Sequence, residues 1–404
     1  MKILTTWTLP LISLLAACCL LGNSALLAKE VDGLFEISVP VENKSNSNRR
    51  DAIREALTEI MIRISGQSTA ASNSVIESSL RKSSAYIQRY LYRESDIDKK
   101  LMLDLFFDQL SLRNLLRDAD LPLWGSNRPQ VLIWIAIGDQ QQRFLLGLDD
   151  QAMMKWIGMP EITNGQSADL TSRQPAELTN GQSADLTSRQ STVREILNLQ
   201  ADKRGLPILL PLMDLEDSMS IGVADVWGRF VAPIRQASIR YNSDAILAAQ
   251  VLKAGDVWTT RWLLLHKGRT ISWEQQSSSI ESALIAGINA TTDQLAEQYA
   301  VFEDSLQRNE ILISVSNIEH IEDYAQLMDY LQQLTSVQNV TVAKVSNSAI
   351  QLRVNLIGDQ QAMLQAISLN NRLVKESMPT INLGGVATKL PSLFFHWNSG
   401  LQLP

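Results

Sequence analysis

Cysteine is almost absent from this 404-residue chain, which has only Cys18 and Cys19. Both lie in the N-terminal segment that ends at Ala28, which we expect to be removed. The remaining chain then cannot form a disulfide, a thiolate nucleophile or a cysteine zinc site. With 45% apolar and 20% charged residues, the chain is long enough for two or three hydrophobic cores. We expect these cores alone to stabilise the fold.

Histidines and catalytic motifs are also scarce. The chain has only His266, His320 and His396, and no two of them have helical zinc spacing. The sequence contains no nucleophile elbow, Walker loop or dinucleotide-binding glycine motif. We therefore predict no enzyme activity, no cofactor and no metal. The alternative is a hydrolase of envelope polymers, whose carboxylates, such as Asp149-Asp150 or Glu216-Asp217, pair only in the folded chain.

An excess of basic charge is missing as well. The formal net charge is −7, and no run of lysine or arginine interrupts this acidity. Nucleic-acid binding depends on clustered basic side chains that neutralise phosphates. We therefore expect no nucleic-acid partner.

The N-terminal segment, from Met1 to Ala28, has the pattern of a secretory signal peptide. A basic start, Met1-Lys2, precedes the apolar run "ILTTWTLPLISLLAACCLL" and the small-residue exit "GNSALLA". This pattern predicts cleavage after Ala28, so that Lys29 begins a periplasmic protein without a membrane span. One alternative is an uncleaved anchor, because the run is near spanning length. The other is an outer-membrane lipoprotein, because residues 15–18 (Leu-Ala-Ala-Cys) match a lipobox that would lipidate Cys18.

A near-exact duplication occupies residues 161–190. "EITNGQSADLTSRQ" at 161–174 recurs at 177–190 with one change, Ile162 to Leu178. Each copy is polar, lacks aromatic residues and contains a turn-forming Asn-Gly pair. Solenoid repeats need an apolar stacking face and usually three or more copies. We therefore interpret the segment as a mobile surface insertion, with a tandem binding motif as the alternative.

The rest of the chain predicts an α+β and α/β multi-domain protein. The first part predicts an N-terminal α+β domain over residues 30–126. Its expected elements are a strand at 33–41, helices at 49–65 and 74–92, a strand at 100–106 and a helix at 107–121. The pattern that follows predicts a central α/β domain over residues 128–303. Its expected elements are a buried strand at 131–137, a helix at 191–204, a strand within 206–214, a helix before the strand at 245–252, a hairpin turning at residues 266–268 and a helix at 279–302.

The last region predicts a small βαββα domain over residues 309–375, similar to a ferredoxin-like or ACT-like half. Residues 376–404 then form a C-terminal tail, either an arm that packs back or a peptide that docks elsewhere. Two aspartates, Asp139 and Asp359, each follow a predicted strand in a "GDQQ" sequence. We interpret them as helix caps, with a metal or ligand role as the alternative.

Tryptophan is the most informative residue type, with nine copies. Trp258 and Trp262 are four residues apart in a predicted strand, so they share one face together with Leu264. This spacing favours a core position, where substitution by alanine costs about 3–5 kcal/mol. The alternative is an exposed binding face formed by Trp258 and Trp262.

One family resemblance begins in the first domain and, through the later stretches "PLWGSNRPQVLIWIAI" and "SDAILAAQV", covers most of the chain after Ala28. "VDGLFEISVPV" followed by "RRDAIREALTEIMIRISG" resembles the opening of an uncharacterised bacterial exported family, domain of unknown function 2066. The central domain is similar, at fold level, to small α/β binding domains of envelope assembly factors. The family resemblance implies export but no activity. From the signal segment and the lack of a catalytic motif, we expect a periplasmic binding or assembly protein of the Gram-negative envelope. Its partner would be an envelope protein or polymer that the sequence does not identify.

Overall fold

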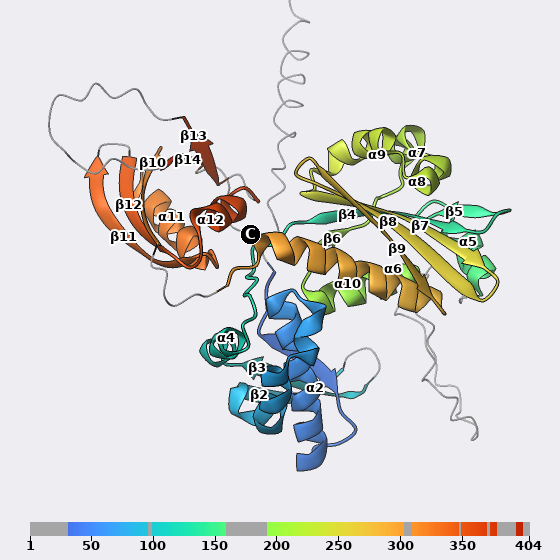
Figure 1. The fold of residues 1–404 in the computed structure, drawn as a ribbon, viewed down its shortest axis with the longest axis horizontal. Coiled ribbons are helices and arrows are strands. Elements are labelled where there is room, and N and C mark those ends of the chain that lie inside the picture. The colour runs from blue at the N-terminus through green and yellow to red at the C-terminus, as the bar shows by residue number, and fades with distance from the viewer. Residues whose placement is uncertain are drawn as a thin grey trace, which may run out of the picture.

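The structure is a computed structural model that describes residues 31–95, 99–158, 192–302, 309–346, 349–369, 372–377 and 393–398. Helices and strands gather into three groups in chain order, each with its own sheet (Figure 1). This confirms a mixed α/β multi-domain fold. The predicted signal segment, with Cys18, Ala28 and Lys29, and the duplication at 161–190 lie outside the described residues.

The N-terminal domain packs helices on a three-stranded antiparallel sheet of order β1-β3-β2. The long helix begins after Ser45, whose side chain accepts a hydrogen bond from the Asn48 amide, and it ends at Gly66, which has φ of 72°. Its buried face packs against the sheet in one core. The elements are β1 (Glu36–Pro40), α2 (Asn46–Ser65), η1 (Ser68–Ser72), α3 (Ser74–Ser79), η2 (Leu80–Tyr86), β2 (Ile87–Glu94), β3 (Leu101–Phe107) and α4 (Gln109–Asp118).

The predicted helix at 74–92 is wrong over its second half. Helix α3 gives way to the 3-10 segment η2, in which Lys82 has non-helical dihedrals, and Ile87 begins strand β2. Strand β2 is mostly exposed, so its hydrophobic pattern is weak. It is stabilised by antiparallel pairing with β3, in which, for example, Tyr92 lies opposite Leu103. Such pairing overrides local helix propensity.

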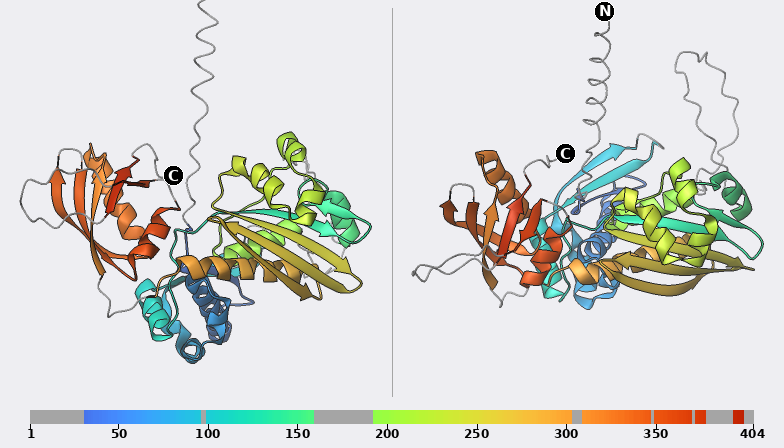
Figure 2. Two further views of the ribbon diagram at one scale, coloured as in Figure 1. Left: turned by 45° about the horizontal axis from the view of Figure 1, so that its top comes forward. Right: turned by 90° about the horizontal axis from the view of Figure 1, so that it is seen from above.

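The central domain is a sheet with helices on both faces. The strand order is β5-β4-β7-β8-β9, with β6 pairing beside β4. Helices α7, α8 and α9 cover one face, and α6 and α10 cover the other (Figures 1 and 2). The elements are β4 (Val131–Gly138), β5 (Arg143–Leu145), α5 (Asp150–Ile157), α6 (Val193–Arg204), β6 (Ile208–Leu209), α7 (Leu215–Ser220), α8 (Val223–Gly228), α9 (Val231–Ser238), η4 (Ile239–Tyr241), β7 (Ala245–Ala254), β8 (Val257–His266), β9 (Arg269–Ser277) and α10 (Ile280–Tyr299).

Local chemistry explains which predictions for this domain hold. All eight residues of β4 are buried, as expected for a strand covered on both faces. The hairpin turns at Lys267 and Gly268, both with positive φ, as a two-residue turn requires.

The single helix expected before β7 is instead α8 and α9. Arg229 adopts a left-handed conformation, and Pro233 is accommodated in the first turn of the second helix. The predicted strand at 206–214 shortens to β6.

The C-terminal domain has the predicted βαββα order, followed by two more strands. Its sheet has the order β11-β12-β10-β14-β13, and its helices pack into the same core. Strand β14 pairs in parallel with β10 and antiparallel with β13. The elements are β10 (Asn309–Ser316), α11 (Ile321–Gln333), β11 (Val337–Ser346), β12 (Ala349–Leu356), α12 (Gln360–Ile367), β13 (Leu373–Glu376) and β14 (Leu393–Trp397).

Residues 393–397 therefore pack back onto the domain, which is the first of the two arrangements expected for the tail, and they do so as a strand of its sheet. Phe395 and Trp397 are buried in the core of the C-terminal domain, because β14 lies inside the sheet. The clustered aromatic residues of this segment thus serve packing. In the described part of the chain, no helix is long and apolar enough to cross a membrane.

Candidate binding groove between the N-terminal and central domains

The segment between the first two domains contains a fully buried arginine. Arg128 has no exposed surface, and its guanidinium lies 4.3 Å from the Trp124 ring. Burial, and then the charges of Arg63 and Arg204, lower its pKa to about 9, so the group remains charged at neutral pH. It donates hydrogen bonds of 2.7–3.0 Å to five backbone carbonyls, those of Arg63, Trp124, Gly125, Arg204 and Gly205.

These carbonyls explain how an arginine without a carboxylate partner is accommodated. Arg63 lies in the last turn of α2, and Arg204 and Gly205 lie at the end of α6. The unpaired carbonyls at a helix C-terminus carry partial negative charge. Arg128 therefore joins the C-terminal ends of two helices that belong to different domains.

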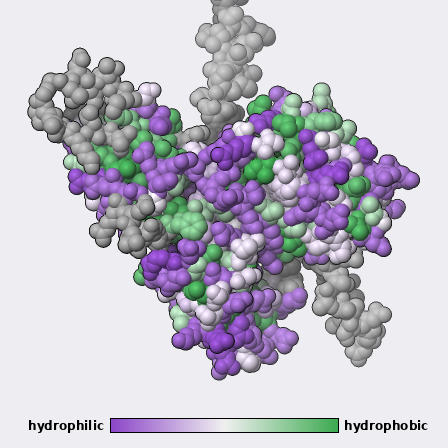
Figure 3. All heavy atoms as spheres, in the orientation of Figure 1, coloured by the Kyte–Doolittle hydropathy of each residue, from purple (hydrophilic) through white to green (hydrophobic). Residues whose placement is uncertain are grey.

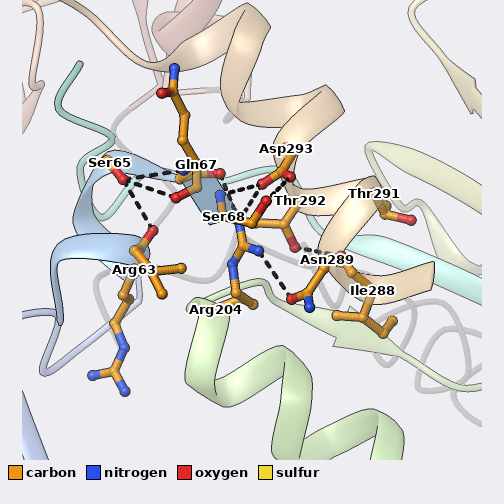
Figure 4. Close-up of polar contacts among 12 residues, drawn as sticks. Arg63, Ser65, Gln67, Ser68, Arg204, Ile288, Asn289, Thr291, Thr292 and Asp293 are labelled. Atoms are coloured by element: carbon orange, nitrogen blue, oxygen red, sulfur yellow. Dashed lines mark hydrogen bonds and ion pairs between the residues drawn. The ribbon is translucent and has the colours of Figure 1, made fainter. Parts of the chain in front are cut away.

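A second arginine strengthens the same junction (Figure 4). Arg204 is 2% exposed, and its Nη2 lies 2.6 Å from Oδ1 of Asp293 on α10 and 2.7 Å from the carbonyl oxygen of Gly66. The Asp293 carboxylate also accepts hydrogen bonds from the Ser68 amide at 2.9 Å and the Ser68 hydroxyl at 2.6 Å. Helices α6 and α10 of the central domain are thereby bound to the end of α2.

Beside this junction lies a groove of about 1010 Å³. One wall is formed by β1 and α2 of the N-terminal domain, and the other by α6 and residues 205–209 of the central domain. Arg63 bridges the two walls, because it donates to the Glu36 carbonyl at 2.8 Å and to the Lys203 carbonyl at 3.0 Å. Burial lowers the pKa of Arg63, while Glu59 and Asp202 act in the opposite direction.

The lining of the groove is half apolar and otherwise largely acidic. Its apolar half includes Leu199, which is 57% exposed. Arg63 and Lys203 are its only basic residues, against the carboxylates of Asp32, Glu36, Glu55, Glu59 and Asp202. Five carboxylates against two basic groups give the lining a formal charge of −3. A groove of this kind complements a partner with both apolar and basic groups.

A strand edge also faces this groove. All five residues of β1 line it, and among the described strands β1 pairs with β3 alone, at the edge of its sheet. The Phe35 carbonyl and the Val41 amide form backbone hydrogen bonds with the β3 side, so residues of the opposite parity direct their backbone groups outward. The Glu36 carbonyl already accepts a hydrogen bond from Arg63, and Pro40 has no N–H that could pair with another strand. The free part of the edge is therefore centred on Ser38.

The histidine of the hairpin belongs to a different, closed cluster. His266 is 3% exposed, with Nδ1 2.9 Å from the Asp244 carbonyl oxygen and Nε2 2.6 Å from the Tyr299 hydroxyl. Because a carbonyl only accepts, Nδ1 carries the proton and Nε2 accepts from tyrosine. Burial lowers the pKa values of His266 and Lys267 and raises those of Asp244 and Tyr299. Such shifts also occur in structural networks, and these residues do not line the groove.

The two tryptophans proposed as a binding face are buried. Trp258 is 6% exposed and Trp262 is fully buried, in the same core as Leu264. Trp262 stacks on Trp273, and Trp258 contacts Trp156 edge-on. They therefore cannot form an exposed binding face, and that alternative is wrong. Their shared face packs in the core that contains α10, in agreement with the core interpretation.

The acidic residues singled out by sequence take part in local structure. Asp150 pairs with Arg194 at 3.0 Å, and Asp217 is fully buried and pairs with Arg240 at 3.1 Å. Asp359 caps α12, as predicted. Asp139 instead accepts from the Gln141 and Gln142 amides in the turn to β5, where no helix begins.

Metal-binding residues do not cluster in the part of the chain that the structure describes, where no group of three or more histidine, cysteine or acidic side chains could hold an ion. The residues that build the groove do not stand out in the sequence. Trp124 and Arg128 lie in "PLWGSNRPQ", a segment whose composition predicts only a closing linker. A tryptophan beside an arginine in such a segment is the available signal, since large aromatic residues are seldom left exposed in linkers.

Comparison with known proteins adds a family match but no activity. Residues 28–125 match the model of a family described as Domain of unknown function (DUF8605). This finding corrects the resemblance to domain of unknown function 2066, because the family model that matches the first domain is a different one. No curated protein matches the chain. One solved structure, "Crystal structure of uncharacterized protein", is similar with 13% identity over 42% of this chain and 91% of its own, with a TM-score of 0.16.

Proposed function

We propose that this chain is an exported, non-enzymatic binding protein of the cell envelope. In this proposal, the groove between the N-terminal and central domains holds a polypeptide segment of an envelope partner. The observation that carries the proposal is the groove itself, which combines a volume of about 1010 Å³ with a lining that is half apolar and has a net negative charge. Pockets for small ligands usually enclose about 300–1000 Å³, so this groove is at the upper end of that range.

The fixed position of the two walls supports binding. Arg128 and Arg204 join the ends of α2 and α6 through short hydrogen bonds in a buried environment. A groove whose walls are already in place loses little conformational entropy when a ligand binds. The walls therefore do not need to assemble around the partner.

The chemistry of the lining supports binding more than catalysis. Among the described residues that line the groove, there is no histidine, cysteine or tyrosine to act as a nucleophile or a general base. Glu59, whose side chain is 27% exposed, is paired with Arg63 at 3.3 Å. The hydrolase alternative needs two carboxylates that face each other, and Glu59 is instead held in an ion pair with Arg63.

Export is the second part of the proposal, and it rests on the sequence from Met1 to Ala28. Mass spectrometry of the protein purified from its native host is expected to identify Lys29 as the N-terminal residue. A lipid-modified Cys18 would instead identify an outer-membrane lipoprotein, and retention of Met1-Lys2 would identify an uncleaved anchor.

Selection from a displayed random-peptide library on the purified chain tests the groove. We expect enriched peptides that combine apolar residues with lysine or arginine. Glu55→Lys, inside the groove, should abolish their enrichment, because it reverses one of the five carboxylates. The matched change Asp51→Lys, one turn earlier on α2 and outside the lining, should leave it intact. Equal enrichment on all three proteins would place the binding elsewhere.

A further inference from the structure

The N-terminal domain has a second cavity with the opposite charge. It encloses about 510 Å³ between the start of α2 and the segment that leads into β2. Nine residues line it, and none of them is acidic: Asn46, Arg49, Arg50, Ile53, Ser84, Ile87, Gln88, Arg89 and Tyr90. Three are arginines, and four more carry a hydrogen-bond donor. This is a concentration of positive charge in a protein whose net charge is −7.

The three arginines are not neutralised by carboxylates in the described structure. Arg49 donates to the Asn46 side-chain oxygen and lies 5.0 Å over the Tyr90 ring. Arg89 lies 3.8 Å over the ring of Phe106, its register partner in β3, so its guanidinium lies on the face of the sheet opposite the neighbouring Tyr90. Neighbouring arginines on the same elements behave differently, because Arg54 pairs with Asp51 at 3.2 Å and Arg93 pairs with Asp104 at 2.8 Å.

We propose that this cavity binds a phosphate group through Arg49 and Arg50, which lie with Asn46 at the start of α2, where this helix lines the cavity. Two guanidinium groups at neighbouring positions, without a carboxylate partner among the described residues, attract an oxyanion. Arginine forms two parallel hydrogen bonds with a phosphate, and stacking on an aromatic ring orients its planar donors. The neutral donors of Asn46 and Tyr90 can complete the coordination of the remaining oxygens.

The surface beside the cavity suggests two sources of the phosphate. Tyr90 is 42% exposed and lies beside Arg49, so part of an aromatic ring is accessible next to the cavity. A phospholipid headgroup could place its phosphate in the cavity and its glycerol and acyl carbons on this surface. A soluble phosphate ester could use the arginines alone. The chemistry of recognition is the same in both cases.

Two measurements on the chain beginning at Lys29 test this site. The first is calorimetric titration with inorganic pyrophosphate, and the second is cosedimentation with phosphatidylcholine vesicles that contain or lack phosphatidic acid. Arg49→Gln and Arg50→Gln are each expected to weaken binding roughly tenfold, which corresponds to one charge-assisted hydrogen-bond pair, whereas Arg89→Gln on the opposite face of the sheet is expected to leave binding unchanged. Arg54→Gln is the control, because it removes the same charge from α2 at a position outside the cavity.

The outcomes separate the two sources. Binding of pyrophosphate without vesicle binding supports a soluble phosphate ester, whereas binding only to vesicles with phosphatidic acid supports a lipid headgroup. Circular dichroism confirms folding of each variant, and Arg50→Gln changes an exposed residue without aromatic stacking. Failure to bind either probe, or equal weakening by Arg54→Gln, would overturn the proposal. Neither result bears on the acidic groove, which lies on other residues.

Discussion

Buried arginines organise this molecule at the residue scale. Among the described residues, Arg128 has no carboxylate partner, yet it donates to five carbonyls, most of them at the ends of two helices. A buried charge is expensive unless its hydrogen bonds are satisfied. The helix ends offset that cost, because their carbonyls also need donors. One side chain thus satisfies polar groups of both domains at once.

Replacing Arg128 should therefore be severe. Arg128→Met leaves five carbonyls without this donor, and we expect a loss of about 3 kcal/mol or more in the free energy of unfolding. Arg128→Lys keeps the charge but not the planar fork, so it should recover only part of the loss. Urea unfolding followed by tryptophan fluorescence measures both variants. A loss below about 1 kcal/mol for Arg128→Met would contradict this account.

His266 predicts a dependence of stability on pH. Burial, together with Lys267 and Arg269, lowers the pKa of the folded histidine below its usual 6.5. As the pH falls through about 6.5, the unfolded chain binds a proton that the folded chain does not. The stabilisation is therefore complete above about pH 6.5 and is lost as the pH falls toward the lowered pKa.

Denaturant melts at several pH values between 7 and 5 measure this effect. The variant His266→Gln has no titrating ring, so its free energy of unfolding should fall less over this range than that of the parent. Asp244, whose pKa is raised by burial, changes in both proteins and cancels in the comparison. Parallel curves for the two proteins would mean that His266 does not cause the dependence.

At the scale of elements, helix α10 lies close to strand β8 because of one glycine. A Cβ at Gly287 would lie 1.9 Å from the nearest ring atom of Trp262. Trp262 is fully buried, so its ring has no free space to move into. The glycine is therefore a packing requirement, although glycine weakens a helix interior.

Gly287→Ala should lower stability despite the better helix propensity of alanine. Propensity alone predicts a gain of about 1 kcal/mol, and overpacking predicts a loss of about 1–3 kcal/mol. We expect the loss to dominate, and thermal unfolding determines the sign. Glu297→Ala on the exposed face of the same helix is the control, with an expected change within about 0.5 kcal/mol. A higher melting temperature for Gly287→Ala would show that Trp262 moves aside.

Periodicity predicted the elements that pack one clear face. The buried run of β4, the amphipathic face of α2 and the turn at Lys267-Gly268 have unambiguous signals. It failed at β2, where exposed residues gave no alternation and pairing with β3 decides the structure. It also failed for β14, because a strand that inserts between β10 and β13 depends on contacts with residues far away in sequence.

At the scale of the whole molecule, the domains are connected by specific polar contacts. Leu123 and Val301 exchange backbone hydrogen bonds of 2.8 and 2.9 Å. Asn127 and Lys267 bind the C-terminal domain through the Ala366 carbonyl and the Ser368 hydroxyl. On the face shown in Figure 3, apolar residues lie in small groups among hydrophilic ones. Polar contacts and local packing therefore connect the domains.

The groove could not be predicted from the sequence for the same reason. Its walls come from residues 31–63 and 198–209, together with Gln130, and their proximity depends on Arg128 and Arg204. Hydrophobic patterns locate each helix and strand, but they do not place one domain against another. Only the acidic composition of the chain indicated the charge that the groove carries.

Photo-crosslinking in living cells tests the central claim most directly. A benzoylphenylalanine at position 199 replaces an exposed leucine of the groove, and one at position 212 replaces an exposed leucine outside it. We expect position 199 to crosslink to one defined peptide of an envelope protein, and Glu55→Lys to remove that crosslink while Asp51→Lys preserves it. If position 199 gives no crosslink, or gives the same products as position 212 regardless of Glu55→Lys, the groove is not the binding site.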